Sequence, residues 1–333
     1  VSAGNLIYRS ESVPIFNRSA GLYLYDKQGR RYLDFEAANG TVPFGYDASL
    51  LSEALQRAAS MPGLPSFCES ELRLSVLDKL ERLFSDGVDR GRVDLDLGGA
   101  QGMETALRIV AANKGPGTIL VFEGAFHGRS GITSMLSSSP RYRELLTAWG
   151  LDVVRIPPPG VIRRETTRRG FMAADEMFGE LTGVGGAQHA RGVVAFIFEP
   201  ILNVGGMFEP DALLLRQYVA AARGEGALII ADEVFTGMHR VGPRWGHQRS
   251  GVDPDIVVTG KGLTNGIAPA SVIWSRGDLA SAENYPPGSH SSTFVGIPTT
   301  LAAIDAVIDR WAAWSQVEGD VAALEAALIG LVS

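Results

Sequence analysis

The stretch "DIVVTGKGLTNG" (residues 255–266) joins the pattern of a buried strand to a lysine in an unexpected place. Four apolar or β-branched residues, 256–259, form a run typical of a strand that is covered on both faces. Lys261 follows at once, between two glycines. A charge at the end of a buried strand must reach water or find a partner. Lys261 is therefore either a solvated loop residue or a side chain directed at a ligand.

Six further short apolar runs accompany this one. They are residues 93–97, 118–122, 153–157, 193–200, 227–234 and 270–274. Helical patterns stand between several of them, as in "GMETALRIVAAN" (102–113) and "DALLLRQYVAAARGEG" (211–226). This alternation predicts an α/β protein with three αβα layers around a mostly parallel seven-stranded sheet. The run 270–274 follows Lys261 after a link too short for a helical crossover, so we expect that strand to be antiparallel.

The N-terminal stretch "GLYLYDKQGRRYLDF" (21–35) has a different pattern, in which apolar and polar residues alternate around a turn at 27–30. This pattern predicts an antiparallel hairpin or meander. We expect it to belong to a small α+β lobe built from the N- and C-terminal segments.

Composition limits the classes of partner. The chain has 333 residues, a net charge of −7 and a single cysteine, Cys68. The negative charge argues against a nucleic acid or an anionic membrane as partner, and no apolar run approaches the roughly 20 residues of a membrane span. One cysteine fits a reducing compartment. We therefore expect a soluble, cytoplasmic protein, and the spacing of its five histidines predicts no metal site.

Glycines follow the first strand of the expected sheet. The run 93–97 ends in "GGAQG" (98–102), where a helix begins. A helix N-terminus offers free N–H groups and a partial positive charge, and glycines let a phosphate approach the backbone. The alternative is a simple tight turn.

A pair of carboxylates ends the strand 227–234. Neighbouring residues of a strand point to opposite faces, so Asp232 and Glu233 cannot serve one ligand, whereas Asp232 and Val234 share a face. A buried carboxylate needs a cationic partner or several donors. The alternative is an acidic strand end in contact with water.

All three features belong at the carboxyl edge of one sheet, where open α/β sheets bind ligands. A phosphate cradle, a carboxylate and a lysine complement the phosphate, the pyridinium nitrogen and the aldehyde of pyridoxal phosphate. A desolvated lysine is a nucleophile that forms a Schiff base with a carbonyl. The sequence therefore predicts a site for this cofactor.

The chain resembles the class III (ω-type) pyridoxal-phosphate aminotransferases of fold type I, from about Gly21 to its C-terminus. The most specific similarity is "ADEVFTG" (231–237) followed by "PDIVVTGKGL" (254–263). Further motifs similar to the family are residues 21–35 and "GGAQGMETALRIV" (98–110), "FEGAFHGRSG" (122–131), "FEPILNVGG" (198–206) and "HSSTFVGIP" (290–298).

The resemblance implies a role for individual residues. Lys261 would form the Schiff base, Asp232 would pair with the pyridinium nitrogen, and the backbone N–H groups of Gly99 and Ala100 would bind the phosphate. Val234 would pack on one face of the ring.

Four more residues complete the expected site. Phe126 would stack on the other face of the ring, His127 would approach the cofactor, and Glu199 would lie near the cofactor and the substrate. Thr293 would reach the phosphate in a neighbouring subunit, which implies a homodimer with shared sites. The alternative for Phe126 and Val234 is an ordinary core position, and for Thr293 it is an ordinary turn.

The resemblance also implies a division of the chain. Residues 1–50 would form the N-terminal part of a small domain, 51–290 a large cofactor-binding domain, and 291–333 the dimer loop and the start of a C-terminal lobe. Family members continue well beyond this point, so we expect a fragment, a domain of a larger synthase or a shortened member.

Some positions depart from the family pattern. Gln101 and Gly102 stand where the family has glutamate and alanine, and "FGYDAS" (44–49) and "VGIP" (295–298) also differ. We expect these departures to alter the substrate preference more than the cofactor. Arg129 and Arg240 are expected to be exposed and structural, with contact to an anion as the alternative.

The implied reaction is ping-pong transfer of an amino group between small-molecule amine and oxo substrates, free or carrier-tethered. The rivals are a decarboxylase, racemase or lyase on the same scaffold, and a non-catalytic dimerising pseudo-enzyme.

Overall fold

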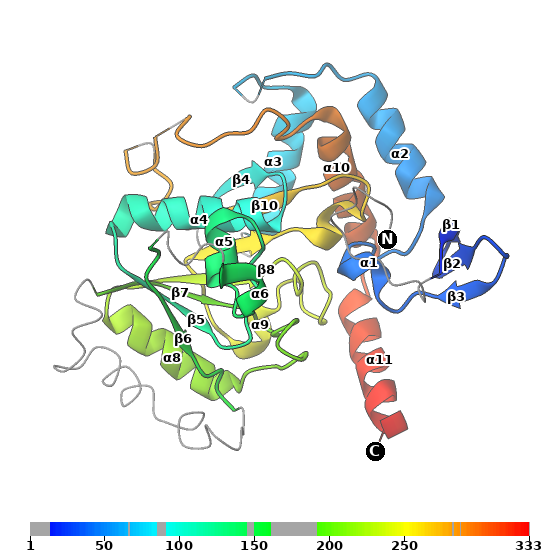
Figure 1. Cartoon of the computed structure of the whole chain (residues 1–333). Coiled ribbons are helices and arrows are strands. Elements are labelled where there is room, and N and C mark those ends of the chain that lie inside the picture. The colour runs from blue at the N-terminus through cyan, green and yellow to red at the C-terminus, as the bar shows by residue number, and fades with distance from the viewer. Residues whose placement is uncertain are drawn as a thin grey trace.

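A large layered body and a small N-terminal sheet make up the protein in this computed structural model (Figure 1). The structure describes residues 14–65, 67–84, 91–144, 150–160, 192–281, 283–286 and 288–332. The first 13 residues of the expected N-terminal segment, and His189, lie outside these ranges.

The central sheet has seven strands in the order β4-β10-β9-β8-β7-β5-β6. They are β4 (Arg92–Asp96), β5 (Thr118–Phe122), β6 (Val153–Ile156), β7 (Val193–Phe198), β8 (Leu228–Glu233), β9 (Ile256–Thr259) and β10 (Ser271–Ser275). β10 is antiparallel to both of its neighbours, β4 and β9, and the other neighbouring pairs are parallel. The mostly parallel seven-stranded sheet and its antiparallel last strand are both confirmed.

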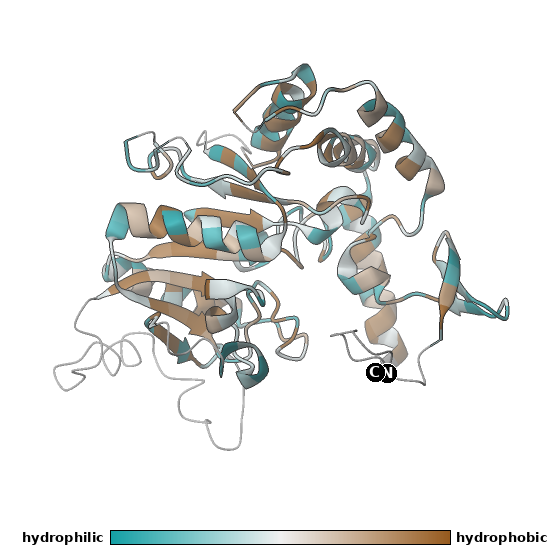
Figure 2. Ribbon diagram, turned by 45° about the horizontal axis from the view of Figure 1, so that its top comes forward, coloured by the Kyte–Doolittle hydropathy of each residue, from teal (hydrophilic) through white to brown (hydrophobic). Residues whose placement is uncertain are grey.

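Helices cover both faces of this sheet. α4 (Gly99–Lys114) packs on one face and α8 (Ala212–Gly224) on the other (Figure 1). β7 serves both cores, because Phe196 and Phe198 point toward α8 whereas Ile197 points toward α4. Hydrophobic residues are accordingly concentrated in the strands between the helices (Figure 2). The expected αβα layers are confirmed. Short helices α5 (Gly131–Leu136), α6 (Pro140–Arg143) and α9 (His247–Ser250) lie in connecting segments.

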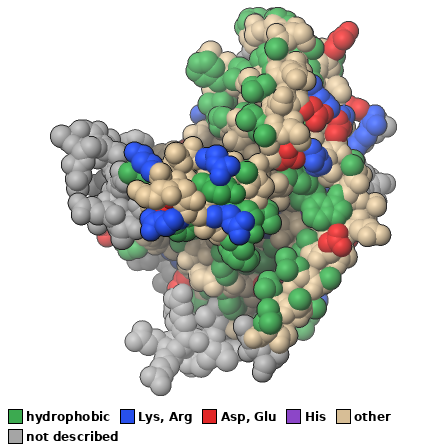
Figure 3. Space-filling model, turned by 90° about the vertical axis from the view of Figure 1, so that its right-hand side faces the viewer, with side chains coloured by type: hydrophobic (Ala, Val, Ile, Leu, Met, Phe, Trp, Pro, Cys, Tyr) green, Lys and Arg blue, Asp and Glu red, His purple; other side chains and the backbone are tan. Residues whose placement is uncertain are grey.

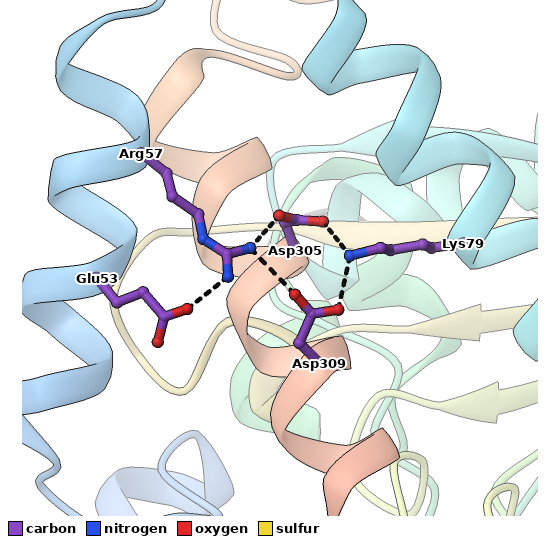
Figure 4. A network of polar contacts seen from close by, with 5 residues as sticks. All are labelled: Glu53, Arg57, Lys79, Asp305 and Asp309. Atoms are coloured by element: carbon purple, nitrogen blue, oxygen red, sulfur yellow. Dashed lines mark hydrogen bonds and ion pairs between the residues drawn. The ribbon is translucent and has the colours of Figure 1, made fainter.

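A second group of helices packs beside β4. α10 (Pro298–Ala313) is buried along most of its length and contacts α2 (Ala48–Ala59) and α3 (Glu71–Phe84). Polar contacts join the three helices (Figure 4): Asp305 accepts from Arg57 and from Lys79 (2.6 Å), and Asp309 accepts from the same two cations (3.2 and 2.6 Å). The last helix, α11 (Val317–Val332), extends away from this body (Figure 1).

The N-terminal sheet is an antiparallel meander, as its alternating pattern predicts. It consists of β1 (Phe16–Ala20), β2 (Tyr23–Asp26) and β3 (Arg31–Leu33). Asp26 fixes the predicted turn by accepting hydrogen bonds from the backbone of Gln28 and Arg30. Basic side chains lie among hydrophobic ones on this side of the molecule (Figure 3), and within the sheet Arg18 lies 3.7 Å from the ring centroid of Tyr25. The short helix α1 (Ala37–Gly40) leads from the sheet to the body.

Candidate active site

A cavity of about 640 Å³ opens at the carboxyl ends of the parallel strands. Its lining includes eight of the nine residues named from the sequence: Gly99, Ala100, Phe126, His127, Glu199, Asp232, Val234 and Lys261. The ninth, Thr293, is exposed and does not line this cavity of its own chain.

Lys261 begins a 3₁₀ turn, η3 (Lys261–Thr264), directly after β9. Its φ of 43° is in the left-handed region. This conformation costs free energy for any residue other than glycine, and it recurs at active sites. Asn265 fixes the end of the turn, since its amide accepts from the backbone N–H of Phe44 and donates to Gly45 O. The backbone therefore presents the Lys261 side chain to the cavity.

The amine of Lys261 is only partly accessible to water. Nζ lies 4.7 Å from the ring centroid of Phe235. Burial lowers the pKa of Lys261; the negative charges of Asp232 and Glu199 oppose this shift, and Arg240 adds to it. A lowered pKa increases the fraction of neutral amine, which is the nucleophilic form.

Asp232 and Glu233 point to opposite sides of β8, as expected. Asp232 lines the cavity, whereas Glu233 accepts from the backbone N–H and ring Nδ1 of His247 (2.7 and 2.8 Å) and from Gly246 N. Asp232 is 5% exposed and Glu233 is 0% exposed. The alternative of an acidic strand end in contact with water is therefore wrong.

His127 is the direct partner of Asp232. Its Nδ1 lies 2.7 Å from Asp232 Oδ2, and its side chain is fully buried. Burial alone would lower the pKa of His127, but the hydrogen bond and charge of Asp232 outweigh burial, so this pKa is raised. The second ring nitrogen, Nε2, is buried and has no hydrogen-bond partner in the described part of the chain.

Glu199 holds the segment that carries Phe126. One carboxylate oxygen accepts from Phe126 N (2.8 Å) and the other from Asn203 N (3.3 Å). Burial raises the pKa of Glu199 to about 7, with the charge of His127 acting in the opposite direction. The Phe126 ring contacts Tyr142 edge to face, with 5.6 Å between the ring centroids.

The N-terminus of α4, where the sequence predicts a phosphate site, lies at the cavity. Gly98 precedes the helix and makes no side-chain cap, so it leaves the N–H groups of the first turn available to a ligand. A Cβ on residue 99 would lie 2.8 Å from Val234 Cγ1, and one on residue 102 would lie 2.7 Å from Ser271 Oγ. A side chain at either position would therefore force a neighbouring side chain to shift, which is a physical reason for Gly102 where the family has alanine.

The two arginines have different surroundings. Arg129 is exposed, as expected, and it lines the cavity 5.7 Å from the Phe126 ring centroid. Arg240 is partly buried and donates to Gly40 O (2.7 Å), so the expectation of an exposed side chain is wrong there. Burial lowers the pKa of Arg240.

Together these residues fit pyridoxal phosphate, because one cavity combines an amine, a carboxylate, an aromatic ring and an uncapped helix N-terminus. Among the described residues there is no cluster of three or more His, Cys, Asp or Glu side chains that could hold a metal. None of the helices in the described ranges has the length and hydropathy of a membrane span.

The sequence is similar to that of known transaminases. The chain is 31% identical to acetylornithine aminotransferase of Lactiplantibacillus plantarum over 291 residues, which are 87% of this chain and 67% of that protein. It is 27% identical to 2-aminoadipate transaminase of Pseudomonas putida over 283 residues, which are 84% of this chain and 66% of the relative. The chain thus spans about two thirds of the length of these relatives.

Solved structures share the fold. An aminotransferase of Bacillus anthracis superposes with a TM-score of 0.81 at 23% identity, covering 92% of this chain and 70% of the other. An (S)-enantioselective omega-transaminase of Thermomicrobium roseum gives a TM-score of 0.78 at 26% identity, with the same two coverages. The expectation of fold type I is confirmed.

The family model for class III aminotransferases matches residues 7–330, nearly the whole chain. Transamination with pyridoxal phosphate, which the sequence motifs predict, is the chemistry of this family. The chain therefore belongs to the class III aminotransferases.

Proposed function

We propose that Lys261 and Asp232 of this chain hold opposite ends of pyridoxal phosphate while an amino group passes from an amine donor to an oxo acceptor. The observation that carries this proposal is that both side chains line one cavity next to the N-terminus of α4. When bound, the cofactor supplies an aldehyde for the amino group and an electron-withdrawing ring.

The surroundings of Asp232 and Lys261 suit each of them to its chemical role. The His127 ring keeps the Asp232 carboxylate in place, and the negative charge of Asp232 would keep the ring nitrogen of the cofactor protonated. Lys261 has a lowered pKa, so its Nζ is suited to bind the aldehyde and, once released, to accept and return the proton of the substrate carbon.

The remaining cofactor contacts follow from the lining of the cavity. The N–H groups of Gly99 and Ala100 would bind the phosphate, and Phe126 and Val234 would cover the two faces of the ring. Glu199 supports this arrangement because it accepts the N–H of Phe126.

We further propose a homodimer with shared sites. Thr293 and Phe294 are exposed, Phe294 by 64%, although the buried Val295 follows them. An exposed aromatic side chain on a fixed loop suits contact with a second copy. The test is a hybrid dimer: Thr293→Ala and Lys261→Ala placed together on one chain should weaken cofactor binding at the partner's site. The same changes divided between the two chains should not.

The substrate class follows from Arg129, a cation in the cavity lining, and from the amino-acid substrates that the names of the relatives give. We propose that the donor carries a carboxylate and that it is free or carrier-tethered. Arg129→Gln should raise KM for carboxylate-bearing amines and leave KM for a simple alkyl amine unchanged. Arg141→Gln, at an exposed arginine of α6, is the matched control.

We also propose a division of the chain into domains and a cellular location. Residues 51–290 would form the cofactor-binding domain, with 1–50 and 291–333 as parts of the small lobe and dimer loop. The single cysteine supports a cytoplasmic location.

One experiment separates transamination from its rivals. The cofactor-loaded protein is incubated with a panel of amines and no oxo acceptor, and the cofactor is then extracted. Pyridoxamine phosphate in amounts stoichiometric with the sites supports a transaminase. Consumption of the amine without pyridoxamine phosphate indicates a decarboxylase, racemase or lyase. A protein that stays colourless with added cofactor contradicts the proposal.

A further inference from the structure

Asp96, the last residue of β4, is a buried carboxylate with an unusual partner. It is 4% exposed, and its Oδ2 lies 2.9 Å from Nε2 of His290. A carboxylate can only accept, so Nε2 carries the proton and donates it. Oδ2 also accepts from Thr105 Oγ1 (2.9 Å), and Oδ1 accepts from Leu97 N (2.8 Å). Several donors therefore fix the orientation of this carboxylate.

The contact joins two functional segments that are distant in the sequence. Asp96 stands three residues before Gly99, where the phosphate cradle begins, and His290 stands three residues before Thr293. Since β4 is part of the rigid sheet, its carboxylate is a firm anchor for the start of the loop 290–297.

The other end of the loop is fixed independently. Gly296 has a φ of 66°, and a Cβ at this position would lie 2.9 Å from Nη1 of Arg73. Val295 is buried beside α10 and its neighbours in the hydrophobic core. Between these two anchors Ser291 and the tip, Thr293 and Phe294, are exposed. A loop held at both ends with an exposed aromatic tip is ordered before it meets a partner.

We propose that Asp96 and His290 form a positioning pair, which holds the tip Thr293–Phe294 in the conformation that docks at the cofactor pocket of a second copy. This inference rests on the shared-site homodimer proposed above. Prior ordering of the tip lowers the conformational entropy lost on docking. Without the His290 contact, the tip would lose more conformational entropy on docking, and this cost would weaken cofactor binding in the neighbouring subunit.

Hybrid dimers with one lysine-bearing site test this proposal. In the first hybrid, His290→Leu and Lys261→Ala are on the same chain, so the intact site receives the altered loop. In the second, His290→Leu is on the chain that keeps Lys261, so the intact site receives an unaltered loop. The affinity for pyridoxal phosphate is measured by fluorescence titration of each hybrid, with a Lys261→Ala/wild-type hybrid as the reference.

We expect the first hybrid to bind cofactor about tenfold more weakly than the reference, in line with the loss of a hydrogen bond to a charged group. The second hybrid should match the reference within about twofold, since its loop is intact. His290→Gln in the first arrangement keeps an N–H donor and should recover most of the affinity. Thr105→Val removes a different donor to the same carboxylate but keeps the His290 contact, so in the first arrangement it should cost less affinity than His290→Leu.

Two results would overturn the positioning role. One is an equal loss of cofactor affinity in both hybrids. The other is no loss in either hybrid although Thr293→Ala, placed on the same chain as Lys261→Ala, weakens cofactor binding. If Thr293→Ala also has no effect from the neighbouring chain, the shared site itself is wrong, and the positioning role fails with it. A wild-type protein that binds no cofactor contradicts the proposed function instead.

Discussion

His127 Nδ1 lies 2.7 Å from Asp232 Oδ2, and both side chains are buried. The other oxygen of Asp232 accepts from Val234 N at 3.1 Å. Each carboxylate oxygen thus has its own partner within the protein. Such prior orientation is what an electrostatic interaction in an active site requires, because no free energy is then spent on reorganisation during the reaction.

The charge of Asp232 is therefore expected to matter more than its shape. Asp232→Asn keeps the shape, removes the charge and should lower kcat by a factor on the order of 10²–10³. His127→Phe removes only the orienting partner and should cost about tenfold. Steady-state kinetics with a fixed donor and acceptor measure both effects.

The control for these variants is Asp253→Asn, which changes a carboxylate whose side chain is 80% exposed. It should leave kcat unaltered. If Asp232→Asn retains wild-type kcat, the assignment of this carboxylate to the ring nitrogen is wrong.

Glu199 should make the stability of the cofactor-free protein depend on pH. Burial raises its pKa from 4.5 to about 7. Between these values the folded protein retains a proton on Glu199 that the unfolded chain has released. The contribution of this proton to stability is therefore complete below pH 4.5 and is lost as the pH rises through 7. Glu199→Gln has no such proton. The difference in free energy of unfolding between this variant and wild type should therefore change in favour of the variant by roughly 1 to 3 kcal/mol as the pH rises from 5 to 8.

Urea denaturation at several pH values measures this difference. Glu283→Gln, at an exposed glutamate, is the control and should differ from wild type by a constant amount. A constant difference for Glu199→Gln as well would contradict the raised pKa.

Periodicity in the sequence predicted more of the fold than of the contacts within the site. The seven apolar runs and the short link after Lys261 were sufficient for the strands and for the antiparallel direction of β10. Period-two alternation also placed Asp232 and Glu233 on opposite faces of β8. These are local features, and they depend on few distant contacts.

Contacts between distant residues could not be read in the same way. His127 and Asp232 are 105 positions apart, and His290 and Asp96 are 194 apart. Nothing local in the sequence distinguishes such a histidine from one in an ordinary loop. Arg240 likewise donates to Gly40, a residue from another part of the chain. The sequence thus indicates which residues reach the same edge of the sheet but not which of them pair.

The ion-pair network of α2, α3 and α10 should contribute unequally through its two aspartates (Figure 4). The Asp305 side chain is 10% exposed and that of Asp309 is 45% exposed, although both contact Arg57 and Lys79. Asp305→Ala should lower the free energy of unfolding by roughly 1 to 3 kcal/mol, because it leaves two partly buried cations with fewer partners. Asp309→Ala, the matched control, should cost less than about 1 kcal/mol. Equal costs in urea denaturation would show that burial does not govern this network.

The central claim is that Lys261 is the amine that binds the cofactor. Its most direct test is to load the protein with pyridoxal phosphate, reduce it with borohydride and locate the modified lysine by peptide mass spectrometry. We expect the adduct on Lys261, its loss in Lys261→Ala, and full labelling in Lys114→Ala, a change of an exposed lysine at the end of α4. An adduct on another lysine of the wild-type protein, with Lys261 unmodified, would contradict the account.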